Sequence, residues 1–209
     1  SMHGYASPGV DRAFLRAREL ARALGDPPEV LHVLLGQVMF HLMRGQMDKA
    51  WQEGEHLLEL AERIEGQAQS SAYLVTIHVL LGVTALYRAD YAGAHEHLET
   101  TIALYDGDRH RDLAYQQGQD PAVAARAFRA RLLWLRGYPG QALGAAQEAV
   151  ALATELDHPY TTTMAVLNLA TIYSYLRRWP ECHAEAQRAR HLARESGFKM
   201  WEANAGILI

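Results

Sequence analysis

The feature that most restricts the fold is one short pattern that recurs four times along the chain. Each copy joins the end of one apolar helix to the start of the next through a tight turn. The copies are LMRGQMDKA, LYRADYAGA, LRGYPGQA and LRRWPEC, and their small residues in equivalent positions are Ala50, Ala94, Ala142 and Cys182. The intervals of 44, 48 and 40 residues are close to the period of proteins built from stacked helix pairs. Because one pair cannot bury its apolar face alone, the pattern predicts several pairs packed together.

Apolar residues recur at intervals of three and four along the chain, and strand-like alternation is absent. This periodicity predicts an all-α protein of about ten helices. Pro121, Pro139, Pro159 and Pro180 stand at or near predicted helix starts, where a missing N–H costs nothing. The predicted helices are 11–24, 29–44, 47–65, 70–88, 91–105, 121–136, 139–156, 159–177, 180–196 and a truncated last one from about 198.

We assign these helices to one domain over residues 11–209, and we expect residues 1–10 to be a cloning scar and a loose lead-in. The helix pairs are units at about 29–65, 70–105, 121–156 and 159–196, with partial units at both ends. The C-terminal partial unit lacks a following helix, whereas terminal repeats normally need a polar outer face. We therefore expect self-association through its apolar residues. These are Phe198, Met200, Trp201, Ile207, Leu208 and Ile209.

Composition narrows the classes of function. The formal net charge of -4 gives no field that would attract nucleic acid or an anionic membrane. The only cysteine, Cys182, excludes an internal disulfide and fits a reducing compartment. No apolar run approaches the roughly 18 residues needed to span a bilayer, and no signal peptide opens the sequence. These observations predict a cytoplasmic protein without nucleic-acid or membrane partners.

The residues inside each unit resemble the tetratricopeptide repeat, whose pattern is W-x2-L-G-x2-Y, then A-x3-F, then P. The second unit has Leu81, Gly82, Tyr91, Ala94 and Leu98 in the matching positions. The matching residues of the fourth unit are Leu169, Ala170, Tyr173, Trp179, Cys182, Ala186 and Ala189. The resemblance implies a right-handed superhelical solenoid of antiparallel helix pairs.

A narrower resemblance rests on the strings IALYD (102–106), GQDP (118–121), LWLRGYPGQAL (133–143) and ALATELDHP (151–159), with His110 and Arg111 between the first two. Together they look like the C-terminal repeat region of large bacterial signalling proteins. In that family, an adenylate/guanylate cyclase or kinase-like domain and an AAA-type ATPase module precede the repeats. The resemblance implies a regulatory role in signal transduction and brings no catalytic residues, because the family's chemistry lies in those other domains.

One string looks like a catalytic motif. HRDLAYQQ (110–117) is compatible with seven of the eight positions of the kinase catalytic loop H-R-D-L-x-x-x-N. Gln117 replaces the Asn, and the chain has no glycine-rich loop, no V-A-I-K and no D-F-G. We interpret the string as part of a long connection over 106–120 that caps neighbouring helices. Alternatively, this loop drapes over the concave surface and gates it through His110, Arg111 and Asp112.

Three further groups of residues resemble functional sites. His95, Glu96 and His97 suggest a metal, but residues two apart on a helix diverge, so a solvated helix face is the better interpretation and no metal site is predicted. Cys182 next to His183 does not form a nucleophile pair, because adjacent helix residues do not face each other. The basic residues Arg126, Arg129, Arg131 and Arg136 could receive an acidic peptide or a phosphate, or could pair with nearby Glu and Asp.

Two classes of function remain, and neither requires a cofactor or makes the chain an enzyme. The first is a protein-interaction and scaffolding module that takes a protein or peptide segment, or another domain of a parent protein. The second is a sensor that binds a small apolar or peptide effector. Both use a concave face built from the first helix of each pair, although large residues there can instead pack between repeats. The candidates are Met39, Met43, Tyr87, Arg131, Trp134, Thr171 and Tyr175.

Overall fold

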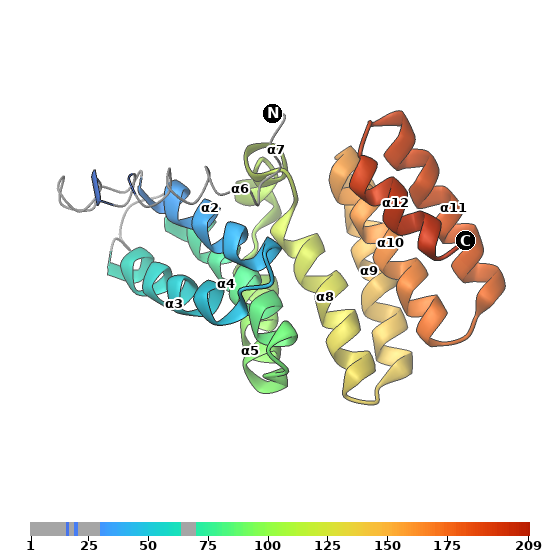
Figure 1. The fold of residues 1–209 in the computed structure, drawn as a ribbon, viewed down its shortest axis with the longest axis horizontal. Coiled ribbons are helices and arrows are strands. Elements are labelled where there is room, and N and C mark those ends of the chain that lie inside the picture. Colours follow the sequence, from blue (N-terminus) through green and yellow to red (C-terminus); the bar gives the residue numbers. More distant parts are fainter. Residues whose placement is uncertain (1–15, 17–18, 21–29, 64–69) are drawn as a thin grey trace. The chain divides into compact units, whose positions relative to one another are not determined.

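A computed structural model describes residues 16, 19, 20, 30–63 and 70–209. The expected lead-in over 1–10 and most of the expected helix over 11–24 lie outside these residues. Within them the chain forms helices joined by short turns and no strand, so the predicted all-α fold is confirmed (Figure 1). The same residues contain no helix long and apolar enough to cross a membrane.

The chain divides into two compact units, residues 1–100 and residues 101–209. In the first unit α2 packs against α3 and α4, and α3 also packs against α4. The helices are α2 (Val30–Met43), α3 (Met47–Arg63), α4 (Ser70–Tyr87) and α5 (Tyr91–Leu104), the last of which crosses the boundary.

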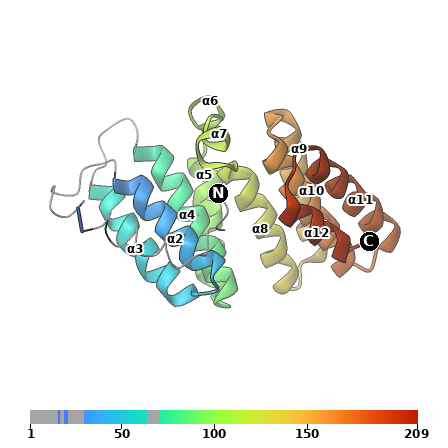
Figure 2. The same cartoon turned by 45° about the horizontal axis from the view of Figure 1, so that its top comes forward.

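The second unit contains α6 (Gly107–His110), α7 (Leu113–Gln117), α8 (Pro121–Leu135), α9 (Pro139–Leu156), α10 (Pro159–Tyr175), α11 (Trp179–Glu195) and α12 (Lys199–Ile207). From α8 onward each helix packs against the next, as both views of this unit show (Figures 1 and 2). The central helix α10 also contacts α8 and α12, so the first helices of successive pairs are neighbours. This is the arrangement of stacked antiparallel pairs that the repeated pattern predicts.

The 106–120 connection differs from the expectation, because much of it is helical. Asp106 begins α6 by accepting a hydrogen bond from the N–H of Asp108 on its carboxylate, at 2.9 Å. Gly118 closes α7 in the left-handed conformation that favours glycine. Two short helices therefore stand where an ordered loop was predicted.

The turns between paired helices share one hydrogen-bonded geometry. After α8, the N–H of Gly137 donates to the carbonyl of Trp134, and the N–H of Tyr138 donates to the carbonyl of Leu133, both at 2.9 Å. This pair of bonds defines the Schellman motif, which requires one residue with positive φ. The same two bonds recur in the other turns. The positive-φ residues are Gly45, Ala89, Gly137, Arg177 and Gly197.

Small residues allow the paired helices to approach closely. The four residues that define the repeated pattern, Ala50, Ala94, Ala142 and Cys182, are all buried. Gly82 in α4 is the tightest such contact with a backbone neighbour. A Cβ atom added there would lie 2.8 Å from Cγ of Leu98 and 3.2 Å from its backbone nitrogen on α5. The Leu81-Gly82 pair of the repeat pattern is thus required by packing.

We predict that Gly82→Ala destabilises the protein by about 1–3 kcal/mol, since the backbone of α5 must move to admit the methyl group. The control is Gly144→Ala in α9, where no atom lies within 4 Å of the added Cβ. That substitution should stabilise by about 0.5–1 kcal/mol through helix propensity. Urea unfolding followed by circular dichroism measures both. Equal stability of the two variants would contradict the close approach of α4 and α5.

Candidate functional site

Two of the predicted binding residues form a stacked aromatic pair on the first helices of the second unit. The rings of Trp134 on α8 and Tyr175 on α10 have centroids 5.6 Å apart and an interplanar angle of 26°. Trp134 is half-buried and packs against a core cluster that includes Leu133, Ala142 and Ile172. Trp134 therefore contributes to the core and remains partly exposed, whereas Tyr175 is exposed.

Arg131 and Thr171 complete the predicted group in this unit. Arg131 lies one helical turn before Trp134, and its guanidinium stands 5.3 Å from the ring centroid of Phe128. Thr171 shares a face of α10 with Tyr175, and its hydroxyl donates to the carbonyl of Leu167 at 2.9 Å. The four candidates of this unit thus lie on two helices that contact each other.

Asn168 was missed by the sequence analysis and belongs to the same face of α10, three residues before Thr171. Its side chain is buried, and Nδ2 donates to the carbonyl of Met164 at 2.9 Å. Oδ1 has no hydrogen-bond partner in the described part of the chain. The sequence signal for Asn168 was a polar residue within an otherwise apolar helix.

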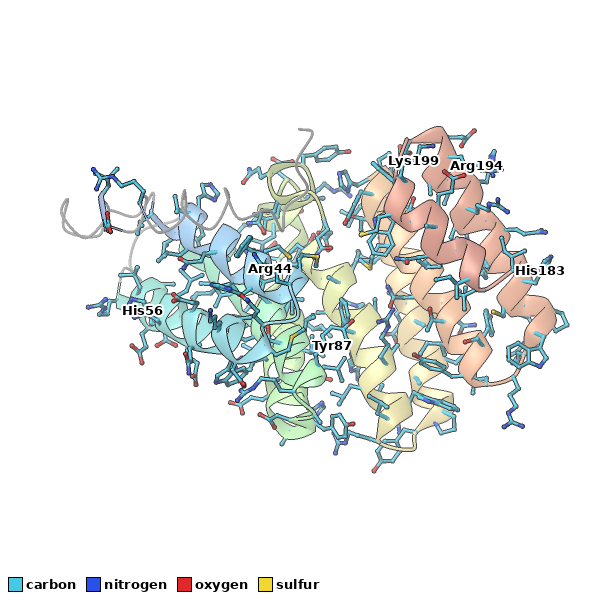
Figure 3. The ribbon with its side chains drawn as sticks, viewed as in Figure 1. Arg44, His56, Tyr87, His183, Arg194 and Lys199 are labelled. Atoms are coloured by element: carbon cyan, nitrogen blue, oxygen red, sulfur yellow. The ribbon has the colours of Figure 1, made fainter. Side chains whose placement is uncertain are left out.

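The candidates of the first unit lie on α2 and α4, which also contact each other. Met39 is half-buried, whereas Met43 and Tyr87 are exposed and are the last residues of α2 and α4. Tyr87 and Arg44 are labelled at the ends of these helices (Figure 3).

The arginines around α8 do not behave as one group. Arg129 reaches Glu148 at 4.0 Å, which is the expected surface pairing. Arg126 instead donates to the carbonyl of Ala122 at 3.1 Å, and Arg136 lies 5.9 Å from the ring centroid of Tyr138. The prediction that this cluster pairs with nearby carboxylates is therefore wrong for Arg136, which makes no ion pair among the described residues.

His110, Arg111 and Asp112 are not arranged as in a kinase catalytic loop. His110 is buried, and its Nδ1 accepts a hydrogen bond from the N–H of Asp106 at 2.9 Å. Arg111 and Asp112 are exposed, and Asp112 makes no capping bond with its side chain. The three residues therefore do not converge. Whether they gate a surface stays a prediction.

A buried carboxylate anchors this segment to two helices. Asp120 accepts hydrogen bonds from the hydroxyl of Tyr105 at 2.6 Å and from the N–H of Val123 at 2.9 Å. Its own N–H donates to the hydroxyl of Thr161 on α10 at 3.0 Å. Burial raises the pKa of Asp120, and the hydrogen bond from Tyr105 opposes this rise. Burial and the bond to Asp120 raise the pKa of Tyr105.

A cavity of about 300 Å³ lies beside this anchor. Its walls come from α6 and the end of α9, and the lining residues are Tyr105, Gly107, Asp108, Arg111, Leu152, Glu155 and Leu156. Three of these side chains carry charge. The cavity is thus built partly by a second helix, α9, and its lining is too polar to suit an apolar effector.

The two histidines of the string His95, Glu96 and His97 have different surroundings. His95 is exposed and lies 3.7 Å from a carboxylate oxygen of Glu99. The solvated-face interpretation is wrong for His97, which is half-buried, with its Nδ1 2.9 Å from Nδ1 of His78 on α4. Among the residues that the structure describes, no three His, Cys, Asp or Glu side chains are grouped to hold a metal ion.

Burial and the neighbouring His97 lower the pKa of His78 from 6.5 to about 4. Burial also lowers the pKa of His97, although Glu96, Asp90 and Glu55 oppose this. We predict no effect of His78 on stability above pH 6.5, where it is neutral in both the folded and unfolded states. Between pH 6.5 and 4 only the unfolded state takes up the proton, so stability falls as the pH falls.

Because His78 is partly exposed, we expect a loss on the order of 1 kcal/mol at pH 4.5, below the full linkage value. Urea unfolding of wild type and His78→Gln at pH 7 and pH 4.5 measures it. The His78→Gln variant should lose part of this pH dependence, and His95→Gln should retain it. Identical pH dependence of wild type and His78→Gln would contradict the account.

Cys182 and the C-terminal helix are both better covered than their sequence suggests. Burial raises the pKa of the Cys182 thiol, which faces the carbonyl of Leu208 at 3.9 Å. Phe198 and Trp201 pack edge-on against Tyr160, with ring centroids 5.3 and 5.5 Å away. The side chain of Leu208 is partly buried against the core. The expectation of an uncovered apolar end is therefore wrong for Phe198, Trp201 and Leu208. The exposed members are Met200, Ile207 and Ile209.

Comparisons with known proteins support the fold. No protein-family model matches the chain. No curated protein matches it either. The chain is similar to a solved structure described as BtubC (BKLC) from P. vanneervenii, with a TM-score of 0.65 and 17% sequence identity. The match covers 95% of this chain and 79% of that one. Similarity at this level of identity shows a common fold.

The stacked pair generates a prediction about stability. Tyr175→Ala should lower the free energy of unfolding by about 1 kcal/mol, the value of an aromatic pair. Trp134→Ala should cost more, about 2–4 kcal/mol, because the indole also packs on the core cluster. Trp179→Ala serves as the control, since its exposed side chain should change stability by less than about 0.5 kcal/mol. Thermal unfolding ranks the three, and the reverse order would contradict the assignment.

Proposed function

We propose that this chain is a non-catalytic protein–protein interaction and scaffolding module. The observation that carries the proposal is the group of Arg131, Trp134, Thr171 and Tyr175 on the contacting first helices of the second unit. Tryptophan, tyrosine and arginine are the residue types enriched where binding energy concentrates in interfaces. Met39, Met43 and Tyr87 extend the same proposal to the first unit, where methionines supply an adaptable surface.

The finer proposal is that the module is the regulatory repeat region of a bacterial cyclase or ATPase signalling protein. The strings from IALYD to ALATELDHP, with His110 and Arg111, support it. A single cysteine fits a reducing compartment and supports action in the cytoplasm. Partners would be a peptide segment or another domain of the parent. The grouping of all helix pairs into a single right-handed solenoid, and self-association through the C-terminal helix, stay predictions.

The second candidate is a sensor that binds a small effector. The cavity beside Tyr105 and Arg111 favours this function, but its charged lining fits a polar ligand. A small apolar effector on the concave face has less support than a peptide on that face. We therefore rank the sensor second.

Selection of peptides from a displayed library against the full chain tests the proposed function. We expect synthetic copies of enriched peptides to bind with dissociation constants below about 100 μM, by fluorescence polarisation. Tyr175→Ala should weaken them about tenfold or more. A thermal-shift screen with small molecules, carried out in parallel, tests the sensor alternative. Small-molecule hits without any peptide binding would contradict the interaction module and favour the sensor.

A further inference from the structure

An exposed apolar side chain ends the first helix of every described helix pair. These residues lie seven positions before the buried small residue, so they occupy one register of the repeat. Their exposed fractions lie between 41% and 54%. They are Met43, Tyr87, Leu135 and Tyr175. Single exposed apolar residues are ordinary. Four in the same register form a systematic feature of the edge where the paired helices turn.

In the second unit this edge gains further aromatic side chains. Tyr138 begins the turn into α9 and is 46% exposed, and Trp179 begins α11 and is 60% exposed. Trp134 stacks on Tyr175 on the neighbouring helix. We call the group of Leu135, Tyr138, Tyr175 and Trp179 the turn-edge patch. Its four side chains come from two successive turns of one unit.

The charge around the turn-edge patch is positive, unlike that of the whole chain. Residues 135–141 and 175–181, which contain the patch, carry three arginines, Arg136, Arg177 and Arg178, and one carboxylate, whereas the chain as a whole carries -4. Arg178 pairs with Glu181. Arg136 and Arg177 make no ion pair in the described part of the chain, so both remain available to a carboxylate.

The first unit lacks this feature. There Arg88 donates to a carboxylate oxygen of Asp48 at 3.1 Å and lies 5.0 Å from the ring centroid of Trp51. Its counterpart after α2, Arg44, lies 5.4 Å from the ring centroid of Phe40. The first unit therefore differs at Arg88, which already pairs with a carboxylate, whereas the ring contact of Arg44 resembles that of Arg136 with Tyr138.

Arg177 stands at a position where arginine is strained. Its φ of 56° is left-handed, and three of the equivalent turn residues, Gly45, Gly137 and Gly197, are glycine. Glycine adopts this conformation without steric cost, whereas an L-residue with Cβ does not. Ala89 at the equivalent turn of the first unit also has positive φ, 61°, so the strain by itself marks no function. A glycine at position 177 would therefore remove the charge of Arg177 and keep the turn.

We infer that the turn-edge patch docks an acidic, extended segment of a partner protein that carries apolar side chains. The inference rests on the proposed function and names the chemistry of the partner. Carboxylates of the segment pair with Arg136 and Arg177, and its apolar side chains lie on Leu135, Tyr175 and Trp179. The edge lies at the turns between helices, outside the middle of the first-helix face.

The geometry also fixes the spacing of the partner's side chains. Packed helices lie about 8–10 Å apart, so the ends of α8 and α10 present two anchor sites at about that separation. An extended segment in the polyproline II conformation has three residues per turn and rises about 3.1 Å per residue. Apolar side chains three residues apart therefore lie on one face of the segment, about 9 Å apart, and match successive turns.

The test uses fluorescein-labelled peptides in which two aromatic residues three positions apart are flanked by glutamates, and matched peptides with glutamine in place of glutamate. Fluorescence polarisation with the full chain should show the glutamate peptides binding at least about tenfold more tightly. Arg136→Gln with Arg177→Gly should reduce this preference to about threefold or less. Equal binding of the two peptide sets to wild type would overturn the inference.

Arg177→Gly separates binding from folding, because it removes the charge and also relieves the strained φ. We expect this variant to melt at a higher temperature than wild type and to bind the glutamate peptides more weakly. Arg188→Gln, an exposed arginine on α11, is the matched control and should bind as wild type does. Unchanged binding by the Arg136→Gln, Arg177→Gly double variant would overturn the proposed edge.

The outcomes distinguish this inference from the proposed function. If library-selected peptides bind but are not acidic, or depend on Arg131 and Thr171 and not on Arg136 and Arg177, the turn-edge patch is wrong and the interaction module stands. If neither the glutamate peptides nor any selected peptide binds, both are overturned.

Discussion

The close approach of paired helices is the constraint on which the rest of the structure depends. A small buried residue near the start of each second helix lets the two helices meet, as at Ala94 and Ala142. The Schellman turn then fixes how many residues separate that contact from the end of the first helix. Because both features repeat, the last residue of each first helix is exposed beside the turn of its own pair. The position of the buried small residue in each pair therefore determines which residue is exposed at the end of the first helix.

Much of this arrangement was predictable from sequence because it is local and periodic. Apolar spacing and proline positions predicted the helices from α2 to α12 except α6 and α7, and most helix ends agree within two residues. Trp134 and Tyr175 were assigned to one face because the repeat register places them there. The helix positions and the shared face of Trp134 and Tyr175 could both be predicted from the periodicity of the sequence.

What the sequence did not predict depends on contacts between distant residues or on very short elements. The partner of His97 is His78, 19 positions away on another helix, and no pattern links them. The helices α6 and α7 span four and five residues, too few to show a helical period. The unpaired state of Arg136 and Arg177 also required the structure, since carboxylates near them in sequence, such as Glu181, are used by Arg178.

The central claim is that acidic segments dock on the turn edge of the second unit. The chain has four tryptophans, whose indole N–H signals report separately in a nitrogen–proton correlation spectrum once assigned by substitution. Trp134 and Trp179 belong to or border the turn-edge patch, whereas Trp51 and Trp201 lie elsewhere. Addition of a glutamate peptide should shift the signals of Trp134 and Trp179 and leave those of Trp51 and Trp201 in place. Shifts confined to Trp51 or Trp201 would contradict the account.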